Sequence, residues 1–173
     1  KLVDWYGLIY GHVTEVSDAP QAYVQAALKG TKTWVSLPRE YWPAHFHNID
    51  DPVVPLLQSL YGHPDAGTFW EEKSHGKILR SGFERTVADS VFWSNELRCL
   101  LMVHVDDFRM SGKPADVKEA WRRFTTGPDA LTLDPPKPPE RELGCYHRYF
   151  DTEINGQPVR AIEYDMRDFM RSC

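Results

Sequence analysis

The chain has 173 residues, of which 42% are hydrophobic and 13% aromatic, which is enough apolar material for one domain with its own core and excludes a disordered chain. Its formal net charge of −5 excludes a protein that binds nucleic acid over its whole surface. The three cysteines lack Cys-x-x-Cys spacing, which predicts neither a disulfide framework nor a zinc site. No long apolar run is present, which predicts neither a signal peptide nor a membrane span. Together these features predict an intracellular protein.

The N-terminal half predicts four segments: a strand over 13–17, a helix over 21–29, a strand over 33–37 and a loop over 39–55. The first strand would deliver Asp18 to its end. Pro20 suits the first turn of the helix, and Gly30 would close it. The acidic pair Asp50-Asp51 lies in the loop and is interpreted as solvated. The chain begins at Lys1 rather than Met, which suggests a piece of a longer protein.

In the C-terminal half, the sequence predicts helices over 65–81, 114–125 and 164–171. It predicts strands over 91–93 and 97–105, a return strand over 108–110, and strands over 145–153 and 159–163. Gly82 would end the first of these helices, and Pro114 would begin the second. The proline-rich stretch 126–142 is interpreted as a connection. Asn155-Gly156 is the strongest hairpin signal in the chain. Basic residues between Arg109 and Arg123 could form a local basic surface, although a solvated helix face is the alternative.

The acidic pair Asp106-Asp107 directly follows the apolar run of residues 100–105. A strand that apolar should be buried, and a buried carboxylate costs several kcal/mol unless something neutralises it. A divalent metal at the end of the strand is the simplest answer. The alternative is a hairpin tip in water, because Asp-Asp is also a common turn sequence.

Three motifs resemble those of reverse transcriptases. Val-Asp-Asp between apolar flanks resembles the Tyr-x-Asp-Asp signature, with His104 in place of tyrosine. Asp18, followed four residues later by Ala22 and then Tyr23, resembles the first catalytic block. Ser59-Leu60-Tyr61-Gly62, continuing through Ala66 to Phe69-Trp70, resembles the Ser-Leu-Tyr-Gly block of copia-type retrotransposons. The motifs occur in the order of the family, and with a weaker match at Leu143-Gly144-Cys145 the resemblance covers roughly residues 13–150.

The resemblance implies an α+β fold, a polymerase palm-like antiparallel sheet with helices packed on one face, as the predicted order of elements also does. Residues 1–125 would be the palm with partial fingers, residues 126–142 the connection, and residues 143–173 a hairpin and helix at the end of the palm or the start of the thumb. The implied activity is RNA-directed DNA polymerisation within a retrotransposon polyprotein. Its partners would be primer-template, deoxynucleoside triphosphates and the other polyprotein domains.

The resemblance also implies the site residues. Asp18 and Asp106 would bridge two Mg²⁺ ions, or Mn²⁺, with Asp107 beside them. Tyr23 would lie beneath the incoming sugar and select deoxyribonucleotides, with a plain core aromatic as the alternative. Gly62 would let the backbone approach nucleotide and template, with Tyr61 as its neighbour.

The sequence departs from the family pattern in ways that keep two alternatives open. Residues 63–68 lack the basic and amide side chains of the family, and the net charge is negative. A palm-fold remnant that binds a partner without turnover is therefore the first alternative. The second is an unrelated metal-dependent hydrolase that uses the same carboxylates.

Overall fold

The computed structural model describes residues 1–142 and 144–172; Leu143, which begins the Leu-Gly-Cys match, and Cys173 lie outside the described residues. The chain divides into two compact units, one formed by residues 1–20 with 75–173 and the other by residues 21–74. The described residues contain no helix with the length and apolarity needed to cross a membrane.

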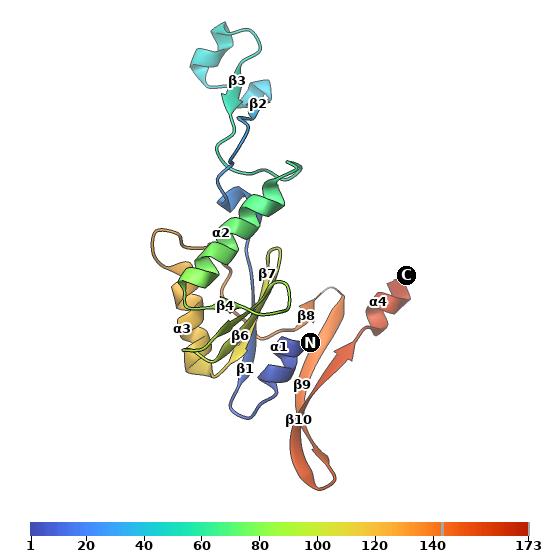
Figure 1. The fold of residues 1–173 in the computed structure, drawn as a ribbon. Coiled ribbons are helices and arrows are strands. Elements are labelled where there is room, and N and C mark those ends of the chain that lie inside the picture. Colours follow the sequence, from blue (N-terminus) through green and yellow to red (C-terminus); the bar gives the residue numbers. More distant parts are fainter. Residues whose placement is uncertain (143, 173) are drawn as a thin grey trace. The chain divides into compact units, whose positions relative to one another are not determined.

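The larger unit is built on a five-stranded antiparallel sheet (Figure 1). Its strands, in spatial order, are β1 (Val13–Asp18), β7 (Asp107–Gly112), β6 (Cys99–His104), β5 (Val91–Ser94) and β4 (Glu84–Arg85). The helix α3 (Pro114–Thr125) covers one face, where the Trp121 indole donates to Glu15 at 2.8 Å. His75 of α2 (Ala66–Arg80) packs edge-on against Phe92 of the same face. The α+β class and the antiparallel sheet are confirmed.

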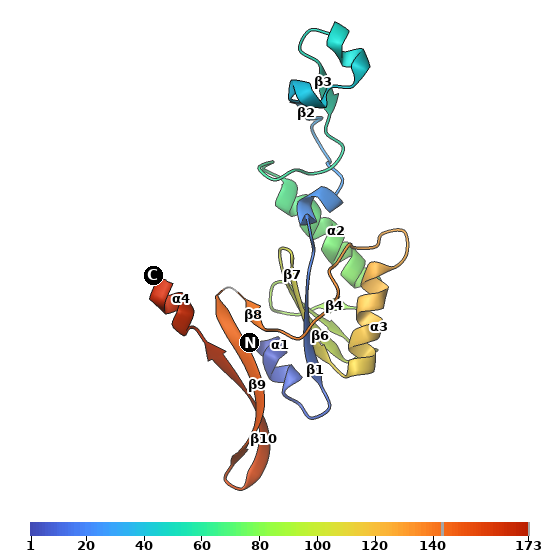
Figure 2. The same ribbon diagram turned by 180° about the vertical axis from the view of Figure 1, so that it is seen from behind.

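The opposite face of the sheet is partly covered by α1 (Leu2–Gly7), a helix that the mixed N-terminal sequence does not predict (Figure 2). Asp4 of this helix forms a buried ion pair with Arg109 of β7. Gly7 lies against Thr14 and Ser111, whose hydroxyls are 2.8 Å apart. The expectation that helices pack on one face alone was therefore wrong, because α1 buries an ion pair on the other face.

Gly7 is expected to tolerate no side chain. A Cβ at this position would stand 1.9 Å from the Thr14 hydroxyl oxygen and 3.0 Å from that of Ser111. Overpacking of this kind costs about 1–3 kcal/mol, so Gly7→Ala should lower the free energy of unfolding measured in urea. Gly67→Ala is the control, since a Cβ there meets nothing within 4 Å, and it should cause no loss. Equal stability of the two variants would contradict the close packing of α1.

The C-terminal part of the larger unit is a second sheet, in the order β10 (Gln157–Asp165), β9 (Cys145–Ile154), β8 (Arg141–Glu142), followed by α4 (Arg167–Ser172). The predicted hairpin is confirmed, and Asn155 and Gly156 turn with φ of 52° and 76°. The last helix starts later than predicted, because Tyr164 and Asp165 pair with β9 and continue the strand.

The predicted connection 126–142 is more ordered than its prolines suggest. The amide of Val16 donates to the Lys137 carbonyl at 2.8 Å, and the amide of Lys137 donates to the Val16 carbonyl at 3.0 Å. The Asp134 amide donates to the Asp18 carbonyl at 2.8 Å. This segment therefore covers the outer edge of β1, which would otherwise expose unpaired backbone groups.

The smaller unit contains short elements: the 3₁₀ turns η1 (Ala22–Gln25), η2 (Arg39–Tyr41) and η3 (Ala44–Asn48), the paired strands β2 (Trp34–Ser36) and β3 (Val53–Pro55), and the beginning of α2. The helix predicted over 21–29 was wrong. Gln21 turns with φ of 53°, and the Leu28 amide donates to the Leu57 carbonyl at 3.0 Å, so the chain after η1 is extended. The loop predicted over 39–55 missed β3, because Pro55 can stand at the end of an edge strand.

Candidate functional site

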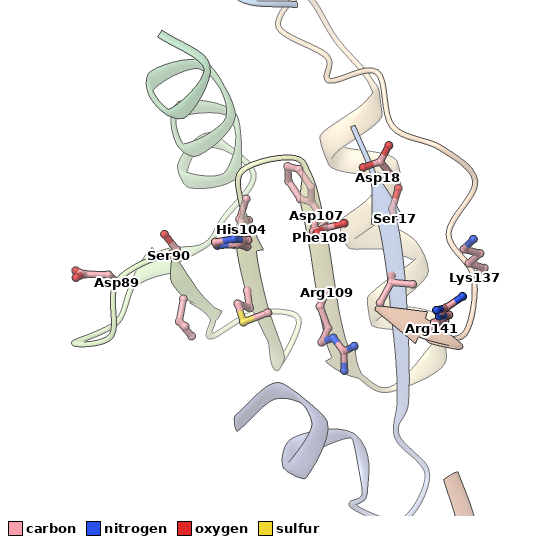
Figure 3. A pocket seen from close by; sticks show the side chains of 14 residues that line it. Ser17, Asp18, Asp89, Ser90, His104, Asp107, Phe108, Arg109, Lys137 and Arg141 are labelled. Carbon is pink, nitrogen blue, oxygen red and sulfur yellow. The ribbon is translucent and has the colours of Figure 1, made fainter. Parts of the chain in front are cut away.

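The sheet register brings two of the predicted carboxylates together. Asp18 at the end of β1 stands directly opposite Asp107 of β7, and Asp107 stands opposite His104 of β6. Directly opposed residues have Cβ atoms about 5 Å apart and point to the same face of a sheet. Asp18, Asp107 and His104 therefore form one row across three strands, and Figure 3 shows all three side chains around one pocket.

Asp106, the third predicted carboxylate, lies in the turn that joins β6 to β7. Its carbonyl accepts a hydrogen bond of 2.9 Å from the Ala19 amide, which ties the turn to the end of β1. Partial burial raises the pKa of the Asp18 carboxyl, and the negative charges of Asp106 and Asp134 raise it further. The Ala19 amide and the charge of Lys137 act in the opposite direction. Negative charge from two other segments, the β6–β7 turn and the segment that contains Asp134, thus acts on Asp18.

The carboxylates are less buried than the apolar run 100–105 suggested. Asp106 is half-buried, while Asp18 and Asp107 are exposed. The turn was predicted at Asp106-Asp107, but its two central residues are Val105 and Asp106, and Asp107 is the first residue of β7. The ladder closes with the His104 and Asp107 pair, so the turn comes one residue earlier. Asp107 therefore lies on the sheet, directly opposite Asp18.

Val105 is the strained residue of this turn. Its φ of 57° is in the left-handed region that β-branched residues avoid, while Asp106 has no positive φ. This is the pattern of a type II′ turn, which favours glycine at its first central position. Backbone strain at functional sites costs of order 1–3 kcal/mol.

Val105→Gly is expected to raise the free energy of unfolding by about 1 kcal/mol, because glycine adopts this φ without strain. Val105 is 45% exposed and does not belong to the buried core. Val105→Ala keeps the Cβ and hence the strain, and should show no such gain when both variants are unfolded in urea. A glycine variant less stable than the alanine variant would contradict the strain.

The pocket beside this row has a volume of about 530 Å³ and lies on the same face of the sheet as α1, in the part that this helix does not cover. Asp18, Asp107 and His104 contribute to its lining. Asp89 and Ser90 lie on the β5 side of the pocket, and Lys137 and Arg141 lie on the β1 side (Figure 3). Arg109 also lines the pocket, although its guanidinium is held by Asp4. Acidic groups at the centre of this pocket are thus flanked by cations on one side.

Carboxylate oxygens are the donors that Mg²⁺ prefers. Partial burial raises the pKa of Asp18, the charges of Asp106 and Asp134 raise it further, and a bound cation would relieve the repulsion between these carboxylates. The donor chemistry and the electrostatics therefore fit a divalent cation. Within residues 1–142 and 144–172, no group of three or more His, Cys, Asp or Glu side chains is arranged to hold a metal ion.

The other predicted site residues belong to the smaller unit. Tyr23 of η1 and Tyr61 pack against each other, with ring centroids 4.8 Å apart and planes at 45°. Tyr61 is 55% exposed. Gly62 turns with φ of 93°, a conformation that favours glycine, and a Cβ there would meet nothing within 4 Å. The structure thus brings the two tyrosines together next to a glycine turn.

Three residues near the pocket were missed by sequence reasoning. Asp134, Lys137 and Arg141 all lie in the proline-rich segment that was interpreted as a connection. Their place near the pocket depends on the pairing of Lys137 with Val16, which is a long-range contact. A segment without strand composition carries no local signal for such pairing.

No protein-family model matches the chain, and no curated protein or solved structure matches it either. The assignment of a function therefore depends on the three motifs and on the geometry of the pocket.

Proposed function

We propose that this chain carries the palm of a copia-type reverse transcriptase and belongs to an RNA-directed DNA polymerase of a retrotransposon polyprotein. The observation that carries the proposal is the pairing of Asp18 with Asp107 across β1 and β7. Two motifs far apart in the sequence, each singled out for its carboxylates, meet at one point of an antiparallel sheet. Helix α3 supports this sheet from the other face, as the palm arrangement requires.

Asp18, Asp106 and Asp107 would hold the divalent ions of a two-metal site. When bound, Mg²⁺ lowers the pKa of the attacking hydroxyl and stabilises the charge that develops on the phosphoryl oxygens. The chain itself fixes the carboxylates. The Asp134 amide donates to the Asp18 carbonyl at 2.8 Å, and the Ala19 amide donates to the Asp106 carbonyl at 2.9 Å. The backbone of each of these two aspartates is therefore held by a hydrogen bond from another residue near the end of β1.

Tyr23 and Tyr61 are proposed to contact the incoming nucleotide. Their packed pair presents aromatic surface with low conformational freedom, and aromatic rings are suited to contact with a sugar or a base. Gly62 beside them lacks the Cβ that would keep a ligand away from the backbone. In this role Tyr23 would reject a 2′-hydroxyl by steric conflict.

A second candidate function is binding without turnover. It is favoured by residues 63–68, which lack the basic side chains expected next to a triphosphate, and by the net charge of −5. His104 also stands where the family has a tyrosine, which weakens the case for positioning of a primer end beside the carboxylates. In this case the pocket would still bind nucleic acid or another anionic partner, but no product would form.

A primer-extension assay tests the proposed function. The chain is mixed with a labelled DNA primer on RNA and on DNA templates, deoxynucleoside triphosphates and Mg²⁺ or Mn²⁺. Extension of the primer that depends on the metal and the template supports the polymerase. Strand binding without extension supports the binding module, and metal-dependent cleavage of the strand without nucleotides would indicate the hydrolase instead.

A further inference from the structure

Two cations stand on the β1 side of the pocket. Lys137 is held in place by its two backbone hydrogen bonds with Val16 of β1. Arg141 opens β8, and its guanidinium lies over the Tyr146 ring, 5.1 Å from the centroid. Both side chains line the pocket that also contains Asp18 and Asp107 (Figure 3). Two residues in hydrogen-bonded segments therefore place positive charge on one side of the carboxylates.

These two cations differ from most arginines of the larger unit, which are paired with carboxylates. The paired residues are Arg80 with Asp129, Arg109 with Asp4, Arg122 and Arg123 with Glu119, Arg148 with Glu163, Arg160 with Asp151, Arg167 with Asp165, and Arg171 with Asp168. Within the part of the chain that the structure describes, neither Lys137 nor Arg141 has a carboxylate within 4.0 Å. Lys137 acts on Asp18 only from a distance, so neither cation is neutralised by an ion pair there and both can bind an anion from outside the chain.

We propose that Lys137 and Arg141 bind phosphate groups of the nucleic-acid strand whose end reacts at Asp18 and Asp107. This inference rests on the proposed function of the same pocket and identifies which side of it holds the strand. Arg and Lys are the usual partners of phosphate, and Arg adds a planar fork of donors. The chain is negative overall, so a strand can be held here only where positive charge is locally unpaired.

A strand explains the position of Arg141 better than a single nucleotide does. Arg141 and Tyr146 are directly opposed in the β8–β9 pair, so both side chains lie on one face of that sheet. Tyr146 is 39% exposed there. A ligand that contacts Arg141 can therefore extend beyond the pocket to the partly exposed side chain of Tyr146. Aromatic surface beside cations suits a strand whose bases can stack.

The test compares strand binding by wild type and by the double variant Lys137→Gln/Arg141→Gln. Binding of a fluorescent primer-template is followed by anisotropy at several KCl concentrations. We expect the double variant to bind at least about tenfold more weakly at low salt, and the slope of log K against log salt to fall by about 1 for each lost phosphate contact. The control Lys113→Gln/Lys118→Gln removes two exposed charges at α3 and should change neither quantity. The charge-preserving variant Lys137→Arg should retain the affinity.

Unchanged affinity and salt slope in a folded double variant would overturn the inference. A raised KM for the nucleotide with unchanged strand affinity would overturn it as well, because the phosphates bound would then belong to the triphosphate. The proposed polymerase is judged separately by extension. A wild type whose strand binding depends on both cations, but which never extends the primer, would support this inference and contradict the proposed function.

Discussion

Replacing Asp4 with Asn is expected to lower the free energy of unfolding by about 3–5 kcal/mol, the usual cost of breaking a buried ion pair from one side. Asp4 is 2% exposed and Arg109 is 4% exposed, so the guanidinium would be left buried without its counter-charge. The Asp4 carboxylate also accepts hydrogen bonds from the Tyr149 hydroxyl at 3.2 Å and the Tyr164 hydroxyl at 2.8 Å. One substitution therefore weakens the contacts of α1 with both the central sheet and the C-terminal hairpin.

The control for this variant is Asp129→Asn, which removes the ion pair with Arg80. Both partners there are more than half exposed, 58% and 59%, so the cost should stay below about 1 kcal/mol. Urea unfolding of the two variants measures the difference. A loss in Asp4→Asn as small as that in Asp129→Asn would contradict the buried network. The double variant Asp4→Leu/Arg109→Met should recover much of the stability, since apolar residues can replace a buried pair.

The pH dependence of stability gives an independent check of this pair. Burial alone would raise the pKa of Asp4, but the charge of Arg109 and the hydrogen bonds from Tyr164 and Arg109 bring it below its ordinary value. The unfolded carboxyl titrates near about 3.9. The stabilisation is therefore fully present at neutral pH and is lost as the pH falls below about 4. The difference between wild type and Asp4→Asn should shrink over that acid range.

Loss of primer extension by at least about 10³-fold is expected for Asp18→Asn and for Asp106→Asn, which corresponds to roughly 4 kcal/mol of transition-state stabilisation. Each variant removes a carboxylate that would hold the metal ions, while an amide of the same size preserves the packing. Asp50→Asn is the matched control, because it belongs to the acidic pair of the smaller unit and should leave extension unchanged. Wild-type rates in the Asp18 or Asp106 variant would contradict the site assignment.

The loss of activity in Asp18→Asn is not expected to reflect unfolding. The pKa of Asp18 is raised in the folded chain by burial and by Asp106 and Asp134, so its ionised form opposes folding at neutral pH. An uncharged Asn removes that repulsion. The variant should therefore be at least as stable as wild type in urea, and a less stable variant would contradict the crowding of negative charge at this site.

Local signals predicted the elements that depend on local chemistry. Pro114 at the start of α3, Gly82 after α2 with φ of 91°, and the Asn155-Gly156 turn each act within a few residues. Asp107 could be singled out as part of an acidic pair after an apolar run, and Asp18 through a motif that resembles the first catalytic block of the family. Their direct opposition follows from the antiparallel register.

Long-range contacts account for what the sequence did not predict. The basic cluster from Arg109 to Arg123 looked like a surface, but Arg109 is buried against Asp4, and Arg123 pairs with Glu96 and Glu119. The edge segment around Lys137 contains too many prolines to be predicted as a strand. The segment is ordered because its backbone forms hydrogen bonds with the edge strand β1, and no local sequence pattern reveals such a long-range pairing.

Calorimetric titration with Mg²⁺ shows whether Asp18 and Asp106 belong to one divalent-metal site. Wild type, Asp18→Asn, Asp106→Asn and the control Asp50→Asn are each titrated in the presence of primer-template and a deoxynucleoside triphosphate. Saturable binding is expected in wild type and Asp50→Asn and should be lost in both Asp18→Asn and Asp106→Asn. Equal binding in all four proteins, or loss in one of the two site variants alone, would contradict a shared site.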